Sequence, residues 1–102
     1  MTESGPAPSF ALTDHARSDL GEIWEFIASD NLDAADRLLD ELEEAMSEAA
    51  RLPLLGHRRE DLTEANVRFW RVRSYLVIYD PESQPLTILR VLSGFRDVAT
   101  LL

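Results

Sequence analysis

The spacing of apolar residues changes near the middle of the chain, and this change limits the possible folds more than any other feature. Between residues 14 and 52, apolar side chains recur every three or four positions, which is typical of amphipathic helices. Between residues 67 and 92, short runs rich in valine, isoleucine, leucine and aromatic residues are typical of half-buried strands. This order predicts an α+β domain, in which an antiparallel sheet carries a helical hairpin on one face.

Two helices are predicted from the apolar stripes and from the residues that can cap them. The first covers about 14–29, and Thr13 or Asp14 can accept hydrogen bonds from the free amides of its first turn. Its stripe consists of Leu20, Ile23, Trp24 and Ile27. The second covers about 32–52, with Asn31 as its cap. The break between them is so short that the helices must form an antiparallel hairpin.

Gly21 lies inside the first predicted helix, where glycine is unfavourable. It destabilises a helix interior by about 1 kcal/mol relative to alanine, because it has more conformational freedom to lose. We therefore expect the backbone of a neighbouring element to approach the helix closely at this position.

The remaining elements complete a β-α-α-β-β-β order. The expected strands are 9–13, 67–72, 75–80 and 86–92. A tight connection at Arg73-Ser74 and a proline-flanked turn at 81–85 make the last three strands an antiparallel meander. Residues 1–8 are expected to form a flexible amino-terminal tail, and residues 9–102 a single domain.

Several kinds of site are excluded by what the chain lacks. It has no cysteine, which removes disulfides, thiolate metal sites and cysteine nucleophiles. Its two histidines, His15 and His57, are 42 residues apart, so neither a metal site nor another cofactor site is expected. No apolar run is long enough to span a membrane, and the first residues do not resemble a secretory signal. We therefore expect a cytoplasmic protein without membrane contact.

The charges are divided unevenly between the two halves of the chain. Residues 1–50 contain 13 acidic residues and 2 arginines, whereas residues 51–102 contain 6 acidic residues and 8 arginines. The net charge of −9 argues against broad nucleic-acid binding, which requires a basic surface. No direct specific DNA binding is expected.

Arginines on and beside the strands are candidates for a binding site. The four candidates are Arg71, Arg73, Arg90 and Arg96. They could converge on a groove for a phosphate or carboxylate partner, because a guanidinium donates two parallel hydrogen bonds to either group. Arg90 also allows a structural interpretation, since an arginine in an apolar strand must be paired. It would then pair with Asp97 or with a carboxylate on a helix.

Aromatic residues predict a second apolar surface. Trp24 and Phe26 lie about 200° apart around a helix. Phe69 and Trp70 likewise point to opposite faces of a strand. The apolar side chains away from the helices need a cover, which a partner's helix or strand would supply. Alternatively, a second copy or the carboxyl tail covers them; the tail residues are Val98, Leu101 and Leu102.

Three sequence segments occur in an order that is typical of one superfamily. They read PLLGHR at 53–58, YLVIY at 75–79 and ILRVLSGFRD at 88–97. Together with the amino-terminal strand and helices, they resemble the ParE/RelE superfamily of bacterial toxins over residues 9–102. The resemblance implies a RelE/ParE-like fold and a role as the toxin of a type II toxin–antitoxin system.

The superfamily contains two kinds of toxin. RelE-like members cleave mRNA on the ribosome, and they usually have an arginine at the position of Leu76 and a histidine or tyrosine near the carboxyl end. ParE-like members inhibit DNA gyrase without chemistry of their own, and segments 75–79 and 94–97 fit this branch better. Ser93 and Phe95 depart from it, because histidine and arginine are common there. The resemblance thus implies a binding inhibitor of gyrase that is neutralised by a ParD-like antitoxin.

The resemblance and the patterns above assign two sets of contact residues and no catalytic residue. Target-binding residues are Arg71, Arg73, Arg90, Phe95 and Arg96. Antitoxin-binding residues are Leu20, Trp24, Phe26, Leu39, Trp70, Tyr75 and Tyr79. One alternative is a RelE-like endoribonuclease that uses the same arginines with His57. Another is a degenerate family member that binds an antitoxin without being toxic.

Overall fold

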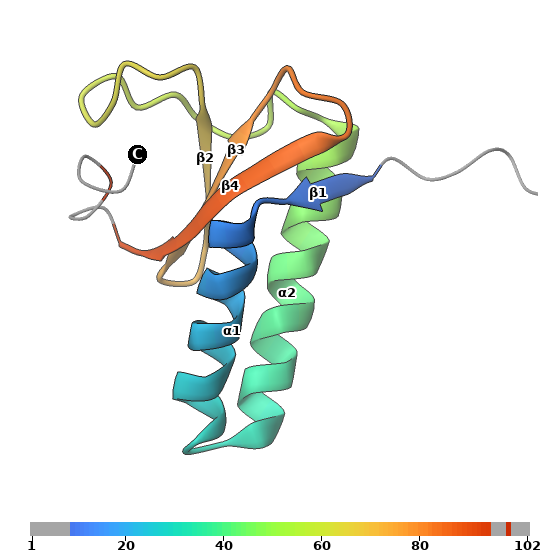
Figure 1. Cartoon of the computed structure of the whole chain (residues 1–102), viewed down its shortest axis with the longest axis vertical. Helices are drawn as coiled ribbons and strands as arrows, with labels where there is room; N and C mark the ends of the chain where they lie inside the picture. Colours follow the sequence, from blue (N-terminus) through green and yellow to red (C-terminus); the bar gives the residue numbers. More distant parts are fainter. Residues whose placement is uncertain (1–8, 95–97, 99–102) are drawn as a thin grey trace, which may run out of the picture.

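A computed structural model describes residues 9–94 and residue 98, and shows a helical hairpin against one face of a four-stranded sheet (Figure 1). The elements are β1 (Phe10–Leu12), α1 (Asp14–Ala28), α2 (Leu32–Arg51), β2 (Arg68–Val72), β3 (Tyr75–Asp80) and β4 (Leu86–Ser93). The predicted element order and α+β architecture are therefore confirmed. The predicted tail, 1–8, lies outside the described residues.

The sheet has the strand order β1-β4-β3-β2. The predicted meander is confirmed, since β2 pairs with β3 and β3 with β4 in antiparallel fashion. The edge strand β1 runs parallel to β4, so the complete sheet is mixed. This follows from the topology, because the helical hairpin and the connector of residues 52–67 return the chain to the same end of the sheet before β2 begins.

Both helices begin at the predicted caps. The Thr13 side chain accepts a hydrogen bond from the backbone N–H of Ala16, and the Asn31 side chain accepts one from Ala34. These bonds satisfy amides that have no partner within a first helical turn. Helix α2 ends at Arg51, just before Pro53, whose ring cannot continue a helix.

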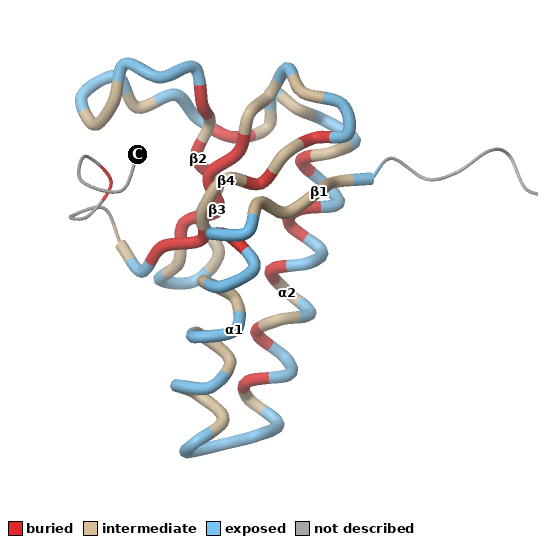
Figure 2. Tube along the Cα trace, in the orientation of Figure 1, coloured by how far each residue is buried: buried red, intermediate tan, exposed pale blue. Residues whose placement is uncertain are grey.

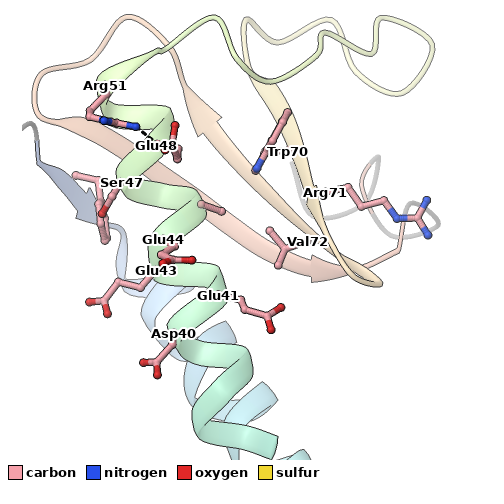
Figure 3. A pocket seen from close by; sticks show the side chains of 12 residues that line it. Asp40, Glu41, Glu43, Glu44, Ser47, Glu48, Arg51, Trp70, Arg71 and Val72 are labelled. Carbon is pink, nitrogen blue, oxygen red and sulfur yellow. Dashed lines mark hydrogen bonds and ion pairs between the residues drawn. The ribbon is translucent and has the colours of Figure 1, made fainter.

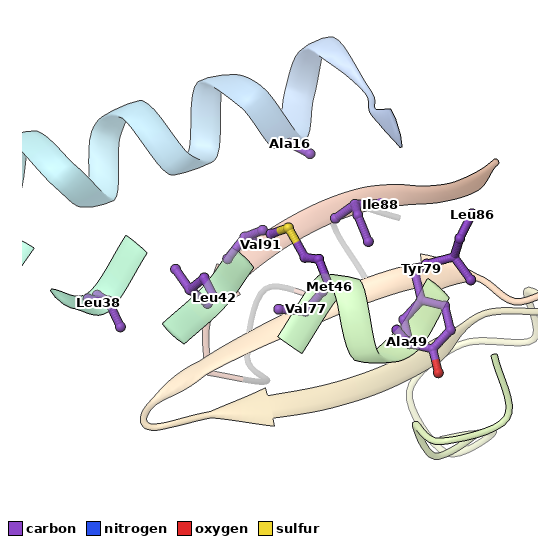
Figure 4. Close-up of a cluster of buried hydrophobic side chains, with 10 residues drawn as sticks. All are labelled: Ala16, Leu38, Leu42, Met46, Ala49, Val77, Tyr79, Leu86, Ile88 and Val91. Atoms are coloured by element: carbon purple, nitrogen blue, oxygen red, sulfur yellow. The ribbon is translucent and has the colours of Figure 1, made fainter. Parts of the chain in front are cut away.

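The main core lies between the helices and the sheet (Figures 2 and 4). Its buried members are Ala16, Leu38, Leu42, Met46, Ala49, Val77, Tyr79, Leu86, Ile88 and Val91. On α2 they follow the helical period of 3.6 residues, and on the strands they follow the two-residue alternation. This explains why the spacing of apolar residues changes near the middle of the sequence. Helix α1 contributes Ala16, and its Leu20, Ile23 and Ile27 pack against the edge of this core.

A second buried cluster covers the sheet face that points away from the helices. It consists of Val67, Phe69, Leu76, Ile78, Leu92 and Val98. Phe69 and Trp70 therefore point to opposite faces, as predicted, with Phe69 in this cluster and Trp70 beside the main core. Val98 has no exposed surface, so this one residue of the predicted carboxyl-terminal cover packs on this face. The other two predicted tail residues, Leu101 and Leu102, lie outside the described residues.

The PLLGHR connector is fixed by the phenol of Tyr79. The Tyr79 hydroxyl donates a hydrogen bond to the carbonyl of Pro53, 2.8 Å away, and accepts one from the N–H of Gly56 at 2.8 Å. His57 then exchanges two backbone hydrogen bonds with Phe69 at the edge of β2. A Cβ atom on Gly56 would lie 2.8 Å from the Tyr79 hydroxyl, which explains the glycine.

Gly21 differs from its prediction. A Cβ atom built on Gly21 meets nothing within 4 Å, so no element described in this structure approaches the helix there. The expectation of a close contact inside the chain is wrong, because α1 turns this position toward solvent.

Candidate functional site

Arg90 is held by Asp19 of α1. Its Nε and Nη2 atoms donate hydrogen bonds of 2.8 and 2.9 Å to the two carboxylate oxygens, and both side chains are largely buried. The backbone N–H of Val91 donates a third hydrogen bond, 2.9 Å long, to the same carboxylate. These hydrogen bonds to Asp19 raise the pKa of Arg90. The structural interpretation of Arg90, a pair with a helix carboxylate, is the arrangement observed.

The pair reinforces a junction between α1 and an irregularity in β4. The register of β3 against β4 shifts between Ile78 and Tyr79, which leaves Leu89 in a β-bulge. The hydroxyl of Thr13 donates to the carbonyl of Leu89 at 2.8 Å, and the N–H of Thr13 donates to the carbonyl of Ile88 at 3.1 Å. Backbone groups beside the bulge are thus satisfied by the start of α1, as buried polar groups require.

Arg73 and Arg71 lie at the β2–β3 turn. Arg73 adopts a left-handed backbone conformation, with φ 57°, and its guanidinium forms two hydrogen bonds of 2.7 Å to Glu41 of α2. Those hydrogen bonds hold the pKa of the Glu41 carboxyl below its ordinary value and raise the pKa of Arg73. The Nε atom of the exposed Arg71 donates to the carbonyl of Arg73 at 2.9 Å.

The three predicted target-binding arginines that the structure describes do not converge on one groove. Arg90 is bound to α1, Arg73 is bound to α2, and Arg71 lies at the exposed edge of β2. The hollow along α2 beside Arg71 is acidic, because the carboxylates of α2 dominate its lining (Figure 3). Two further predicted target contacts, Phe95 and Arg96, lie outside the described residues.

The predicted antitoxin-binding residues fall into different environments. Tyr79 has no exposed surface, so it holds the connector and is unavailable for a partner. Trp70 is half-buried, and His57 stacks on it with ring centroids 6.4 Å apart. Phe26 is 77% exposed, whereas Trp24 is half-buried and donates from Nε1 to Asp36 at 2.9 Å.

Two hollows flank α1, and they divide the other predicted contacts. We call the first the helix groove; it lies between β1, α1 and α2 and is lined by Phe10, Leu12, Leu20, Leu39, Leu42, Glu43 and Met46. The second is the α1–β4 hollow, lined by Asp19, Glu22, Ile23, Phe26, Tyr75, Arg90, Val91, Leu92 and Ser93. Leu20 and Leu39 therefore share the helix groove, while Phe26 and Tyr75 share the α1–β4 hollow.

No group of three metal-binding side chains is found among residues 9–94 and 98. His15 is exposed on α1, and His57 is occupied with Trp70 on the connector. Within the same residues, no helix combines the length and apolar character needed to cross a membrane.

The family model described as the ParE toxin of the type II toxin–antitoxin system parDE matches residues 10–98. The chain belongs to the ParE toxin family. Among solved structures, it is similar to one titled "Chromosomal ParDE TA system from P. aeruginosa", with a TM-score of 0.69 and 17% sequence identity. That match covers 86% of this chain and 97% of the other chain, and it shows that the fold is shared. No curated protein matches the chain significantly.

In this ParE-family chain, the sequence did not identify the two carboxylates that pair with Arg90 and Arg73. Asp19 was missed as the partner of Arg90, although its place beside Leu20, at the edge of an apolar stripe, is a signal for a half-buried carboxylate. Glu41 of α2 was likewise not predicted as the partner of Arg73, which lies at the β2–β3 turn. Neither contact follows from local spacing, because both join elements far apart in the sequence.

Proposed function

We propose that this chain is a ParE-like toxin that inhibits DNA gyrase by binding and is neutralised by a ParD-like antitoxin. The family match over residues 10–98 carries the proposal. The similarity to a chain from a ParDE system supports the antitoxin partner. A gyrase target implies that the protein acts in the cytoplasm.

Binding is favoured over RNA cleavage by the environments of the arginines and histidines. Cleavage would need a base, an acid and cations around one phosphate. Here Arg73 and Arg90 are each engaged with a carboxylate on a different helix, and His57 stacks on Trp70. This arrangement supports a protein that acts by binding another macromolecule.

Within this proposal, Arg71 is the cation that contacts the target. It is exposed at the edge of β2, and within the described residues its one hydrogen bond is to a backbone carbonyl, so its remaining donors can reach a carboxylate or phosphate. Arg90 is instead assigned a structural role, because Asp19 occupies its guanidinium.

The test is a titration of the purified chain into a gyrase reaction. We expect loss of supercoiling and accumulation of cleaved DNA, and we expect Arg71→Ala to require a concentration about tenfold higher. Arg37→Ala, on the exposed face of α2, is the matched control and should act like the unaltered chain. Unchanged supercoiling over a wide concentration range would reject gyrase as the target, and new ribosome-dependent mRNA cuts would favour the RelE-like alternative.

A further inference from the structure

We infer that Glu41 and Arg73 form a positioning clamp that fixes the orientation of the Arg71 guanidinium for contact with the target. We call this pair the turn clamp. The inference rests on the proposed function, since Arg71 is the target contact there. It adds the device that orients Arg71, which is built from α2 and the β2–β3 turn.

Arg73 has a backbone conformation that arginine seldom adopts. Its φ of 57° lies in the left-handed region, where the Cβ atom is crowded and where glycine or asparagine is more common. The tight connection between two antiparallel strands favours such a conformation. Glycine would adopt it without strain. An arginine at this position therefore indicates that its side chain makes a contact that the molecule uses.

The side chain of Arg73 ties the turn to α2. Its Nε and Nη2 atoms donate hydrogen bonds of 2.7 Å to the two carboxylate oxygens of Glu41. Such a two-bond contact between planar groups fixes both distance and direction. The pair is open to solvent, with side-chain exposures of 62% for Arg73 and 39% for Glu41, so it contributes little to stability. Its main effect is to fix the position of the turn.

The backbone carbonyl of Arg73 in turn restrains Arg71. It accepts a hydrogen bond of 2.9 Å from the Arg71 Nε atom. Because Nε is engaged, the rotation of the guanidinium is restricted, and the N–H groups at its outer end remain for a partner. Figure 3 shows the Arg71 side chain pointing away from α2. The turn clamp thus connects α2 to a cation that faces away from that helix.

A restrained arginine binds better than a free one, because less side-chain freedom is lost when the complex forms. Arginine has many rotamers, so an exposed arginine without a restraint loses a large part of this freedom on binding. The turn clamp removes part of that loss before the target arrives.

A direct target contact by Arg73 is the competing explanation, and the two explanations differ in sign. If Arg73 contacted the target, Glu41 would compete for its guanidinium, and Glu41→Ala would strengthen inhibition. If the pair is a clamp, Glu41→Ala releases the turn and Arg71, and inhibition becomes weaker.

The first experiment measures the concentration of purified chain that halves gyrase supercoiling. Glu41→Ala and Arg73→Gly should each raise this concentration about fivefold. Arg73→Lys retains a cation for Glu41 and should lose less than Arg73→Gly. In a chain that already carries Arg71→Ala, Glu41→Ala should have no further effect, because the clamp acts through Arg71.

The variants are expected to remain folded. Glycine suits the left-handed conformation at position 73, and alanine suits a helix at position 41. Their melting temperatures should therefore stay close to that of the unaltered chain. Arg58→Ala is the matched control, because it breaks another exposed ion pair, with Glu60 of the connector, and should leave inhibition unchanged.

The second experiment observes Arg71 without gyrase. The NMR signal of its Nε–H group is identified as the one that Arg71→Ala lacks. A hydrogen-bonded N–H exchanges with solvent more slowly than a free one. This exchange should become about fivefold faster in Glu41→Ala and stay unchanged in Arg58→Ala.

The outcomes separate the inference from the proposed function. Unchanged exchange of the Arg71 signal in Glu41→Ala, or unchanged or stronger gyrase inhibition by that variant, overturns the turn clamp and leaves the proposed function standing. If the unaltered chain does not inhibit gyrase, the proposed function fails, and the NMR signal alone decides whether Glu41 and Arg73 position Arg71.

Discussion

At the scale of single residues, a few polar side chains connect the elements of this small fold to one another. Asp19 accepts three hydrogen bonds and links α1 to β4. Tyr79 links β3 to the connector through its hydroxyl. Each group has its partners inside the chain, so losing one partner leaves another polar group unsatisfied in a water-poor environment, which is the costly case.

Replacement of Arg90 by alanine is expected to destabilise the protein by about 3 kcal/mol, because Asp19 would remain largely buried without its cation. Asp19→Asn should have a comparable effect. Urea unfolding measures both, with the exposed Arg37→Ala as the control. A stable Arg90→Ala protein that has lost only its toxicity would show instead that Arg90 contacts the target.

Gly56→Ala is expected to destabilise the fold by about 2 kcal/mol, because the new methyl group would overlap the Tyr79 hydroxyl and approach the Phe69 carbonyl to 3.0 Å. Thermal unfolding of this variant can be compared with that of Gly21→Ala, where the same methyl group enters open space. Equal melting temperatures for the two variants would contradict the close packing at Gly56.

Stability should fall at alkaline pH because burial raises the pKa of Tyr79. Below a pH of about 10, the ordinary pKa of tyrosine, the Tyr79 phenol is protonated in both the folded and the unfolded chain. Its contribution to the free energy of unfolding is then complete. As pH rises from there through the folded pKa, the unfolded chain ionises first and stability is lost. Urea midpoints across this range measure the loss. Tyr79→Phe should show a shallower decline, and an equal slope would exclude Tyr79 as the cause.

At the scale of elements, the helical hairpin has two unlike flanks. On one flank α1 and α2 line the helix groove with Leu20 and Leu39; on the other, α1 meets β4 through Asp19. Trp24 and Phe26 leave α1 on opposite sides, so one helix can serve two surfaces. The short β2–β3 turn is tied to α2 through Arg73 and Glu41.

Trp24→Ala is expected to destabilise the protein by less than about 2 kcal/mol, below the 3–5 kcal/mol typical of a core tryptophan. The indole is half-buried, lies outside the main core, and makes one exposed hydrogen bond to Asp36. Chemical denaturation gives the value, with Leu42→Ala as a core reference. A loss as large as that of Leu42→Ala would place the indole in the core.

At the scale of the whole molecule, the two faces of the sheet are closed by different means. The helices cover one face, while Val98 and Leu62 pack on the other. Such double coverage lets a chain of 102 residues bury both faces of a sheet without a disulfide. Among the residues that the structure describes, the surfaces that stay open include the hollows beside α1, the hollow along α2 and the edge of β2, where Arg71 is exposed.

The sequence by itself determined the elements and their order. Apolar spacing located both helices and all three strands of the meander to within about two residues, and Thr13 and Asn31 marked the helix starts. These signals are local, because a helix stripe, a strand alternation and a cap each involve residues close together in the chain. The order of the three motifs also pointed to the family that residues 10–98 match.

Only the tertiary structure decided which side chains meet. The Arg90–Asp19 pair, the Arg73–Glu41 pair and the contact of Tyr79 with Gly56 join residues 71, 32 and 23 positions apart. In the sequence, several carboxylates were possible partners for each arginine. The packing of the helices on the sheet determines which carboxylate each arginine meets. Tyr79 was predicted to contact a partner but is buried, because strand alternation gives the face of a residue but not what covers that face.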